Sequence, residues 1–210
     1  MPVINATIDG VAVEIEEGCT GTQYYESRSD VVAMTVDGNA WDLSREIPTD
    51  ATVEAITLNS PAGLEILRHS CTHVMAQAVQ EIFPDVNLGI GPFITDGFYY
   101  DFGNIDSVTP ELMRDIEKRM KRIVKEGQVF RRRVVTEEEA REELADQPFK
   151  LELISTKGGG AQDASVEVGG SELTIYDNVR RDGTTAWKDL CRGPHVPDTS
   201  VIRNFKLLSV

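Results

Sequence analysis

The chain has 210 residues, of which 40% are hydrophobic, and it carries a net charge of −14 at pH 7. Its length allows one large domain or two small ones, and no apolar run approaches the roughly 18 residues needed to cross a membrane. Three cysteines are too few, and odd in number, for a disulfide framework. We therefore expect a reduced, cytoplasmic protein with no membrane segment.

Residues 1–58 predict a compact, acidic and mostly β module. Strands are expected at Val3–Ile8, Val11–Glu16, Val31–Val36 and 53–58, with a short helix at 20–27. Asp9-Gly10 lies between the first two of these strands and is typical of a hairpin turn, and Asp37-Gly38 follows the strand at Val31–Val36. Nothing in this module indicates chemistry, so a small solubilising domain is the simplest interpretation.

A long amphipathic helix is predicted next. Ser60-Pro61 supplies an N-cap and a first-turn proline, apolar residues recur at helical spacing, and the helix is expected to stop before Pro84. Two of the three histidines of the chain, His69 and His73, lie in this helix. Because they are four residues apart, they share one face.

A second helix is predicted from Thr109-Pro110 to near Gly127, followed by a strand at Val129–Val135. The helix carries a basic stripe at spacings of three and four residues, made of Arg114, Lys118, Lys121 and Lys125. The stripe is either a solvated face or a contact for phosphates. Residues 114–133 carry a net charge of +6, so a nucleic acid would meet a local patch on a surface that otherwise repels it.

The last third of the chain predicts one more helix and several strands. Thr136-Glu-Glu-Glu139 is a capping box that opens a charged helix, and Gly158-Gly-Gly160 indicates a flexible loop. Strands are expected at 172–178, 186–190 and 203–209. The chain ends without a tail or a helix cap, and we expect it to be a piece of a longer polypeptide.

The third histidine belongs to Cys191-x-x-x-His195, where Gly193-Pro194 predicts a tight turn. Together with His69 and His73 it would form a cluster closed across more than a hundred residues. Two chemistries use such a cluster: a tetrahedral zinc site, or a metal-free hydrolysis in which one imidazole is a general base on water. The alternative is structural, with hydrogen-bonded core histidines and a small buried cysteine.

Four motifs occur in order along residues 60–210. They are His69-Ser-Cys-Thr-His73, Gly91-Pro92 before Asp96-Gly-Phe-Tyr-Tyr-Asp101, Cys191-Arg-Gly-Pro-His195 and Phe205-Lys-Leu-Leu-Ser209. This part of the chain resembles the editing domain of bacterial-type threonyl-tRNA synthetases. Residues 1–59 resemble the small β-grasp (TGS-type) module of that family, with its helix reduced to 20–27. The resemblance implies an α+β fold, in which the β-grasp domain precedes a larger domain with a mixed or antiparallel sheet packed by helices.

The resemblance also implies a function, which is hydrolysis of serine wrongly esterified to threonine tRNA. The pocket would be lined by His69, His73, Tyr100, Lys150, Asp189, Cys191 and His195. In that pocket, Tyr100 and Asp189 would bind the hydroxyl, amine or ribose of the substrate. Lys150 would stabilise charge on the attacked carbonyl or contact the terminal nucleotide.

By the family's pattern, we expect His73 or His195 to position or deprotonate the water. No cofactor is required by the resemblance, and zinc stays an open alternative. The partners it implies are threonine tRNA and the rest of a synthetase chain. The aminoacylation core and the anticodon-binding domain are not in this sequence, so we expect it neither to activate threonine nor to bind ATP.

Two other functions remain possible at this point. Alanyl-tRNA editing domains share the histidine and cysteine framework and use zinc, but they usually carry Cys-Gly-Gly-Thr-His where this chain has Cys191-Arg-Gly-Pro-His195. A non-catalytic RNA-binding or regulatory module would use the basic stripe and the N-terminal module. The concentration of all three histidines in one cluster argues against pure binding.

Overall fold

The computed structural model describes residues 2–105, 107–156 and 172–208. Contacts between Cα atoms divide the chain into two units, Met1–Leu67 with Pro194–Pro197 and Arg68–Gly193 with Asp198–Val210. Each unit contains both helices and strands, which makes the fold α+β. Within the described ranges, no helix has both the length and the apolar character needed to span a membrane.

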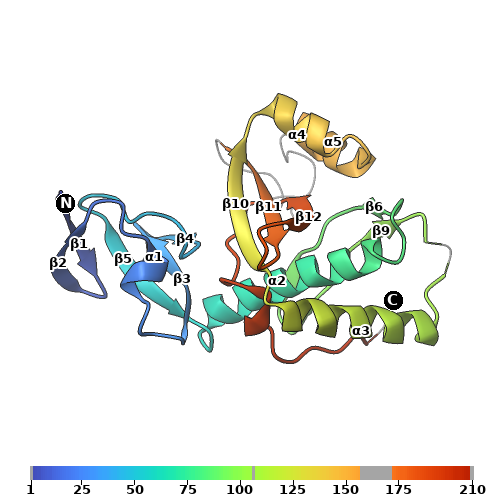
Figure 1. Ribbon diagram of the computed structural model, residues 1–210, viewed down its shortest axis with the longest axis horizontal. Helices are drawn as coiled ribbons and strands as arrows, with labels where there is room; N and C mark the ends of the chain where they lie inside the picture. The colour runs from blue at the N-terminus through green and yellow to red at the C-terminus, as the bar shows by residue number, and fades with distance from the viewer. Residues whose placement is uncertain (1, 106, 157–171, 209–210) are drawn as a thin grey trace. The chain divides into compact units, whose positions relative to one another are not determined.

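The first unit is built around a five-stranded sheet (Figure 1). Its elements are β1 (Val3–Ile8), β2 (Val11–Glu16), α1 (Gly21–Tyr24), β3 (Val31–Val36), β4 (Asn39–Trp41) and β5 (Thr52–Thr57). The strand order is β2-β1-β5-β3-β4, with β1 and β5 parallel and the other neighbours antiparallel. Its core contains Ile8, Met34 and Val53, all almost inaccessible to solvent.

The hairpin turn predicted at Asp9-Gly10 is confirmed, and Asp37-Gly38 forms a second turn of the same kind between β3 and β4. Asp9 and Gly10 have φ of 50° and 79°, and Asp37 and Gly38 have φ of 49° and 81°. Positive φ at both central residues gives the backbone twist that matches the flanking strands, and Asp-Gly adopts it at low cost. The expected helix at 20–27 is shorter, because only Gly21–Tyr24 is helical after a capping box at Thr20.

In its described residues, the second unit contains a three-stranded antiparallel sheet and four helices. Its helices are α2 (Pro61–Gln80, which begins in the first unit), α3 (Pro110–Glu126), α4 (Glu137–Glu143) and α5 (Pro148–Thr156), with a 3-10 turn at Thr199–Val201. The sheet has the order β10-β11-β12 and is formed by β10 (Val129–Val135), β11 (Leu173–Val179) and β12 (Thr185–Leu190). Two small ribbons pair β6 (Asn87–Leu88) with β9 (Phe102–Gly103) and β7 (Phe93–Ile94) with β8 (Gly97–Phe98).

The three-stranded sheet is covered on both faces. On one face, the Asn178 side chain donates to Gln77 of α2 at 2.8 Å, and the Trp187 indole N–H donates to Gln80 at 2.6 Å. On the other face, Ile175 packs against α4 and α5 within a buried apolar cluster. Because strand residues alternate between faces, β12 presents residues 187 and 189 to the first side. This alternation places the end of β12 beside the histidines of α2.

The starts of α2, α3 and α4 and the end of α3 are formed by capping residues. The hydroxyl groups of Ser60, Thr109 and Thr136 each accept a backbone N–H three residues later, and Gly127 closes α3 with φ of 61°. Each N-cap hydroxyl accepts a hydrogen bond from a backbone N–H group in the first turn, which has no acceptor within the helix. The predicted starts of three helices are therefore confirmed.

In the last third of the chain, one helix was not predicted and one predicted strand is absent from the described residues. The charged helix stops at Glu143, and a further helix, α5, was not predicted. The expected strand at 203–209 is absent from its described part, residues 203–208. There, the Leu207 backbone N–H and the Lys206 ammonium bind the Glu117 carboxylate of α3. The Glu117 side chain thus supplies the hydrogen-bond acceptor that a neighbouring strand would otherwise provide. The predicted glycine loop at 158–160 lies outside the described residues.

Candidate functional site

The two histidines of α2 are buried and adjacent. His69 and His73 are 3% and 1% exposed, and their rings meet edge to face with centroids 5.4 Å apart. This pairing follows from their four-residue spacing on one helix. The Thr72 hydroxyl donates to the carbonyl oxygen of His69 at 2.7 Å. The helix thus delivers both imidazoles into the interior from one face.

Cys191 directly follows β12 and is held by its backbone and by a turn. Its N–H donates to the Thr174 carbonyl at 3.1 Å, and the Thr174 hydroxyl donates back to the Cys191 carbonyl. The backbone N–H of Gly193 donates to Cys191 Sγ at 3.2 Å. Gly193 has φ of 70°, and a Cβ there would lie 1.9 Å from the Tyr176 hydroxyl. The predicted turn is present, and only glycine fits it.

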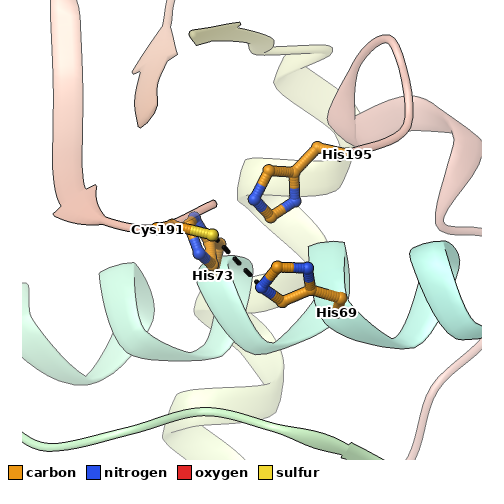
Figure 2. A group of neighbouring side chains, drawn as sticks. All are labelled: His69, His73, Cys191 and His195. Atoms are coloured by element: carbon orange, nitrogen blue, oxygen red, sulfur yellow. Dashed lines mark hydrogen bonds between the residues drawn. The ribbon is translucent and has the colours of Figure 1, made fainter. Parts of the chain in front are cut away.

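The structure brings the two histidine motifs together. The ligand atoms of His69, His73, Cys191 and His195 all lie within 4.8 Å of one another, and all four residues are buried. Figure 2 shows the cysteine sulfur facing the His69 ring, and Cys191 Sγ lies 3.3 Å from His69 Nε2. The His195 backbone N–H donates to the buried Asp42 carboxylate at 2.9 Å.

The remaining three predicted site residues, Tyr100, Lys150 and Asp189, form a second buried network. Lys150 and Asp189 are both fully buried, with the Lys150 ammonium 3.1 Å from each carboxylate oxygen. The Tyr100 hydroxyl donates to Asp189 Oδ2 at 2.6 Å, and its ring lies 5.5 Å from the ammonium. The Leu190 backbone N–H donates to Asp189 Oδ1 at 2.8 Å. The carboxylate is therefore satisfied by one cation and two neutral donors.

Burial sets the protonation states of these groups. It lowers the pKa of His73 well below its usual value, and the nearby charges of His69 and Lys150 lower it further. His73 is thus neutral near pH 7, when an imidazole can accept a proton. Burial raises the pKa of Asp189, while the Lys150 ammonium and the Tyr100 hydroxyl oppose that rise. Cys71, on the same helix, has a pKa raised to about 12 by burial alone.

The His/Cys cluster could hold a metal ion such as zinc. Three imidazoles and one thiolate are typical zinc donors, with metal–ligand distances of about 2.0–2.3 Å. Two ligands at those distances are about 3.5 Å apart in a tetrahedron, close to the 3.3 Å between Cys191 Sγ and His69 Nε2. The donor set therefore fits zinc.

Sequence reasoning missed several neighbours of the cluster. The Trp187 ring lies edge-on to His73, with centroids 5.2 Å apart, and Phe130 lies 6.2 Å from the same ring. Asp42 and Thr174 hold the backbone of the second motif. Trp187 sits in a predicted strand, but nothing in its local sequence indicates which residue it faces. Only the pairing of strands and helices gives that information.

Comparisons with known proteins agree with the motifs. Residues 166–210 match the family described as "Threonyl and Alanyl tRNA synthetase second additional domain". The chain is 67% identical over 191 residues to a threonine-tRNA ligase of Cutibacterium acnes, covering 91% of this chain and 28% of that protein. It is 54% identical to the threonine-tRNA ligase of Micrococcus luteus, covering 94% of this chain and 30% of that protein. It is 51% identical to the threonine-tRNA ligase of Thermobifida fusca, covering 99% of this chain and 32% of that protein. The chain thus spans about a third of the length of these relatives.

Proposed function

This chain belongs to the threonine-tRNA ligase family, and from that premise we propose that it carries the family's proofreading activity. Residues 60–210 would form an editing domain that hydrolyses the aminoacyl ester of threonine tRNA mischarged with serine. Residues 1–59 would form a TGS-like β-grasp module, and the sheet order with parallel β1 and β5 supports that assignment. Its partners would be threonine tRNA and the aminoacylation and anticodon-binding domains of a cytoplasmic synthetase.

The buried cluster of His69, His73, Cys191 and His195 is the observation that carries this proposal. In the reaction, the oxygen of a water attacks the ester carbonyl carbon, and a neutral imidazole takes a proton from that water. The bond to the ribose oxygen then breaks, and that oxygen receives the proton. The products are free serine and uncharged tRNA. We assign the role of this general base to His73 or His195.

Tyr100, Lys150 and Asp189 would form the part of the pocket that binds substrate. Their network places a carboxylate, an ammonium and a hydroxyl within hydrogen-bond distance of one another. The Asp189 carboxylate is suited to the amino group of an aminoacyl ester, and the Lys150 ammonium to negative charge developing on the attacked carbonyl oxygen. Because both charges are already paired, substrate groups would join an existing network.

A separate hydrolytic site has a physical reason. Serine lacks one methyl group of threonine, and such a difference is worth only about 1–3 kcal/mol to a binding pocket. An aminoacylation site therefore accepts some serine. A second, tighter pocket can admit serine and exclude threonine by steric overlap, so that the correct product survives.

Zinc bound by the cluster would act as a Lewis acid and lower the pKa of a bound water to about 7. That role needs an open coordination position, and catalytic zinc sites usually have three protein ligands. All four donors of the cluster together would fill a tetrahedral site. We therefore propose that hydrolysis here uses the side chains without a required metal. Metal analysis of protein purified without chelator tests this, and one zinc per chain with loss of activity on chelation would refute it.

The test of function is deacylation of seryl-tRNA and threonyl-tRNA, both on threonine tRNA, at high protein concentration. We expect selective release of serine, and loss of at least 100-fold in rate for His73→Ala. Cys71→Ala is the matched control, because this buried residue lies on the same helix outside the cluster. Equal hydrolysis of both esters would exclude a size-selective pocket.

Two outcomes would favour the other candidate functions. Preferential hydrolysis of alanyl-tRNA that depends on zinc would indicate an alanyl-type editing enzyme. Binding of tRNA with no ester hydrolysis would indicate a non-catalytic module. Unchanged rates in both His73→Ala and His195→Ala would exclude the assigned base.

A further inference from the structure

Helix α3 presents a row of lysines to solvent. Its buried side is fixed by Ile116, Met120 and Ile123, which are 6%, 0% and 0% exposed. Lys118, Lys121 and Lys125 are exposed and recur at spacings of three and four residues. At 100° per residue these lysines lie within about 60° of one another, on the side opposite the core.

The cations of α3 fall into two groups, and Arg114 belongs to the paired group because its guanidinium binds the Glu111 carboxylate. Arg119 and Arg122 lie close to the Glu81 carboxylate, so their charge is largely used within the fold. In contrast, no carboxylate of the described residues lies within 4.0 Å of the ammonium groups of Lys118, Lys121 or Lys125. The charge of these three lysines is therefore available to a partner.

A residue distant in sequence extends the row. Gly127 ends α3, and the guanidinium of Arg181 lies 3.5 Å from the position that a Cβ of residue 127 would occupy. Arg181 is exposed in the turn between β11 and β12, and it has no ion pair with a described residue. The turn thus adds a fourth exposed positive charge at the end of the helix.

We propose that this basic face, made of Lys118, Lys121, Lys125 and Arg181, binds the sugar-phosphate backbone of the tRNA. The inference rests on the proposed function, which makes a tRNA the substrate. A chain with a net charge of −14 repels a polyanion over most of its surface. Three unneutralised lysines along about 10 Å of helix, with Arg181 beside the end of that helix, are a local site for phosphates.

The composition of the face favours RNA over an acidic protein. Lysine is depleted from protein–protein interfaces, where aromatic and apolar residues form the centre. None of the four members is apolar. Lysine ammonium groups on flexible stems act as point charges toward phosphates. The face is therefore suited to positioning an RNA without reading its bases.

The experiment measures binding of unacylated threonine tRNA to the whole chain by fluorescence anisotropy, between 50 and 200 mM salt. The test variant is Lys118→Gln/Lys121→Gln/Lys125→Gln. The control changes three exposed or ion-paired arginines elsewhere, Arg28→Gln/Arg132→Gln/Arg141→Gln, and alters the net charge equally.

We expect the lysine variant to bind at least 10-fold more weakly at 50 mM salt than the wild type. The slope of log K against log salt should fall by about 2 to 3, since each phosphate contact contributes about 0.7–0.9. Arg181→Gln alone should lower the slope by about 0.7–0.9. The control variant should stay within twofold of the wild type.

Four results would overturn the inference. They are no tRNA binding by the wild-type chain at 50 mM salt, unchanged binding in the lysine variant, equal losses in both triple variants, and displacement of tRNA by polyglutamate at equal charge concentration. The last would indicate a site for acidic proteins. Because the probe is unacylated, binding is independent of hydrolysis. Selective loss of binding in the lysine variant without any deacylation by the wild type would keep this inference and refute the proposed function. Deacylation by the wild type, together with unchanged tRNA binding in the lysine variant, would support the proposed function and refute this inference.

Discussion

Replacing Lys150 with methionine should strongly destabilise the second unit. The Lys150 ammonium lies 3.1 Å from both Asp189 carboxylate oxygens, and both side chains are fully buried. At an effective dielectric constant of 20, their attraction at this distance is about 5 kcal/mol before desolvation. Methionine fills the volume of the lysine stem but leaves the Asp189 charge without its cation. Breaking a buried pair in this way costs about 3–5 kcal/mol.

The cost should depend on pH, because Asp189 can escape it by taking up a proton. Burial raises the pKa of Asp189, and removal of Lys150 eliminates the charge that opposes the rise. A carboxyl group whose folded pKa lies above its unfolded value is favourable below the unfolded pKa, and the fold loses stability as pH rises through the folded pKa. The deficit of Lys150→Met should therefore be smaller at pH 5 than at pH 8.

Urea unfolding followed by circular dichroism at pH 5 and pH 8 measures both effects. Lys150→Met/Asp189→Asn is the matched variant, in which the buried charge is also removed and the Tyr100 hydroxyl keeps an acceptor. We expect the double variant to recover at least half of the loss at pH 8. A Lys150→Met protein within 1 kcal/mol of the wild type at pH 8, with no dependence on pH, would show that the pair is not charged.

Two further predictions concern stability. Gly193→Ala should cost at least 2 kcal/mol more than Gly183→Ala, since both have positive φ but only the first meets a neighbour, the Tyr176 hydroxyl; equal urea midpoints would contradict the clash. The hydrogen bonds that Arg133 donates to both Glu143 oxygens, with burial opposing, lower the pKa of Glu143 to about 2. Glu143→Gln should therefore cost about 1 kcal/mol at pH 7 after allowance for solvent screening, a difference that shrinks as pH falls from about 4.5 toward 2. A constant difference across that window would refute the role of the carboxylate charge.

Local sequence predicted the elements whose causes are themselves local. The turn at Asp9-Gly10 follows from the positive φ that these residues tolerate, and the starts of α3 and α4 follow from Thr109 and Thr136 as N-caps. These features depend on a few neighbouring residues, so a single sequence is enough. Where a segment is satisfied by a distant side chain, the prediction was wrong: residues 203–208 bind Glu117 of α3 in place of a neighbouring strand.

The sequence by itself determined which residues are available for chemistry, because it concentrates all three histidines in two motifs and places His69 and His73 on one helical face. Tertiary structure alone decided that Cys191 Sγ reaches His69 Nε2 across 122 residues, and that Lys150 is buried against Asp189. Helical periodicity fixes neighbours within a turn, whereas contacts between elements depend on which faces pack together. The sequence pattern therefore shows which residues are neighbours on one helix, and the packing of the sheet against α2 decides which residues meet across elements.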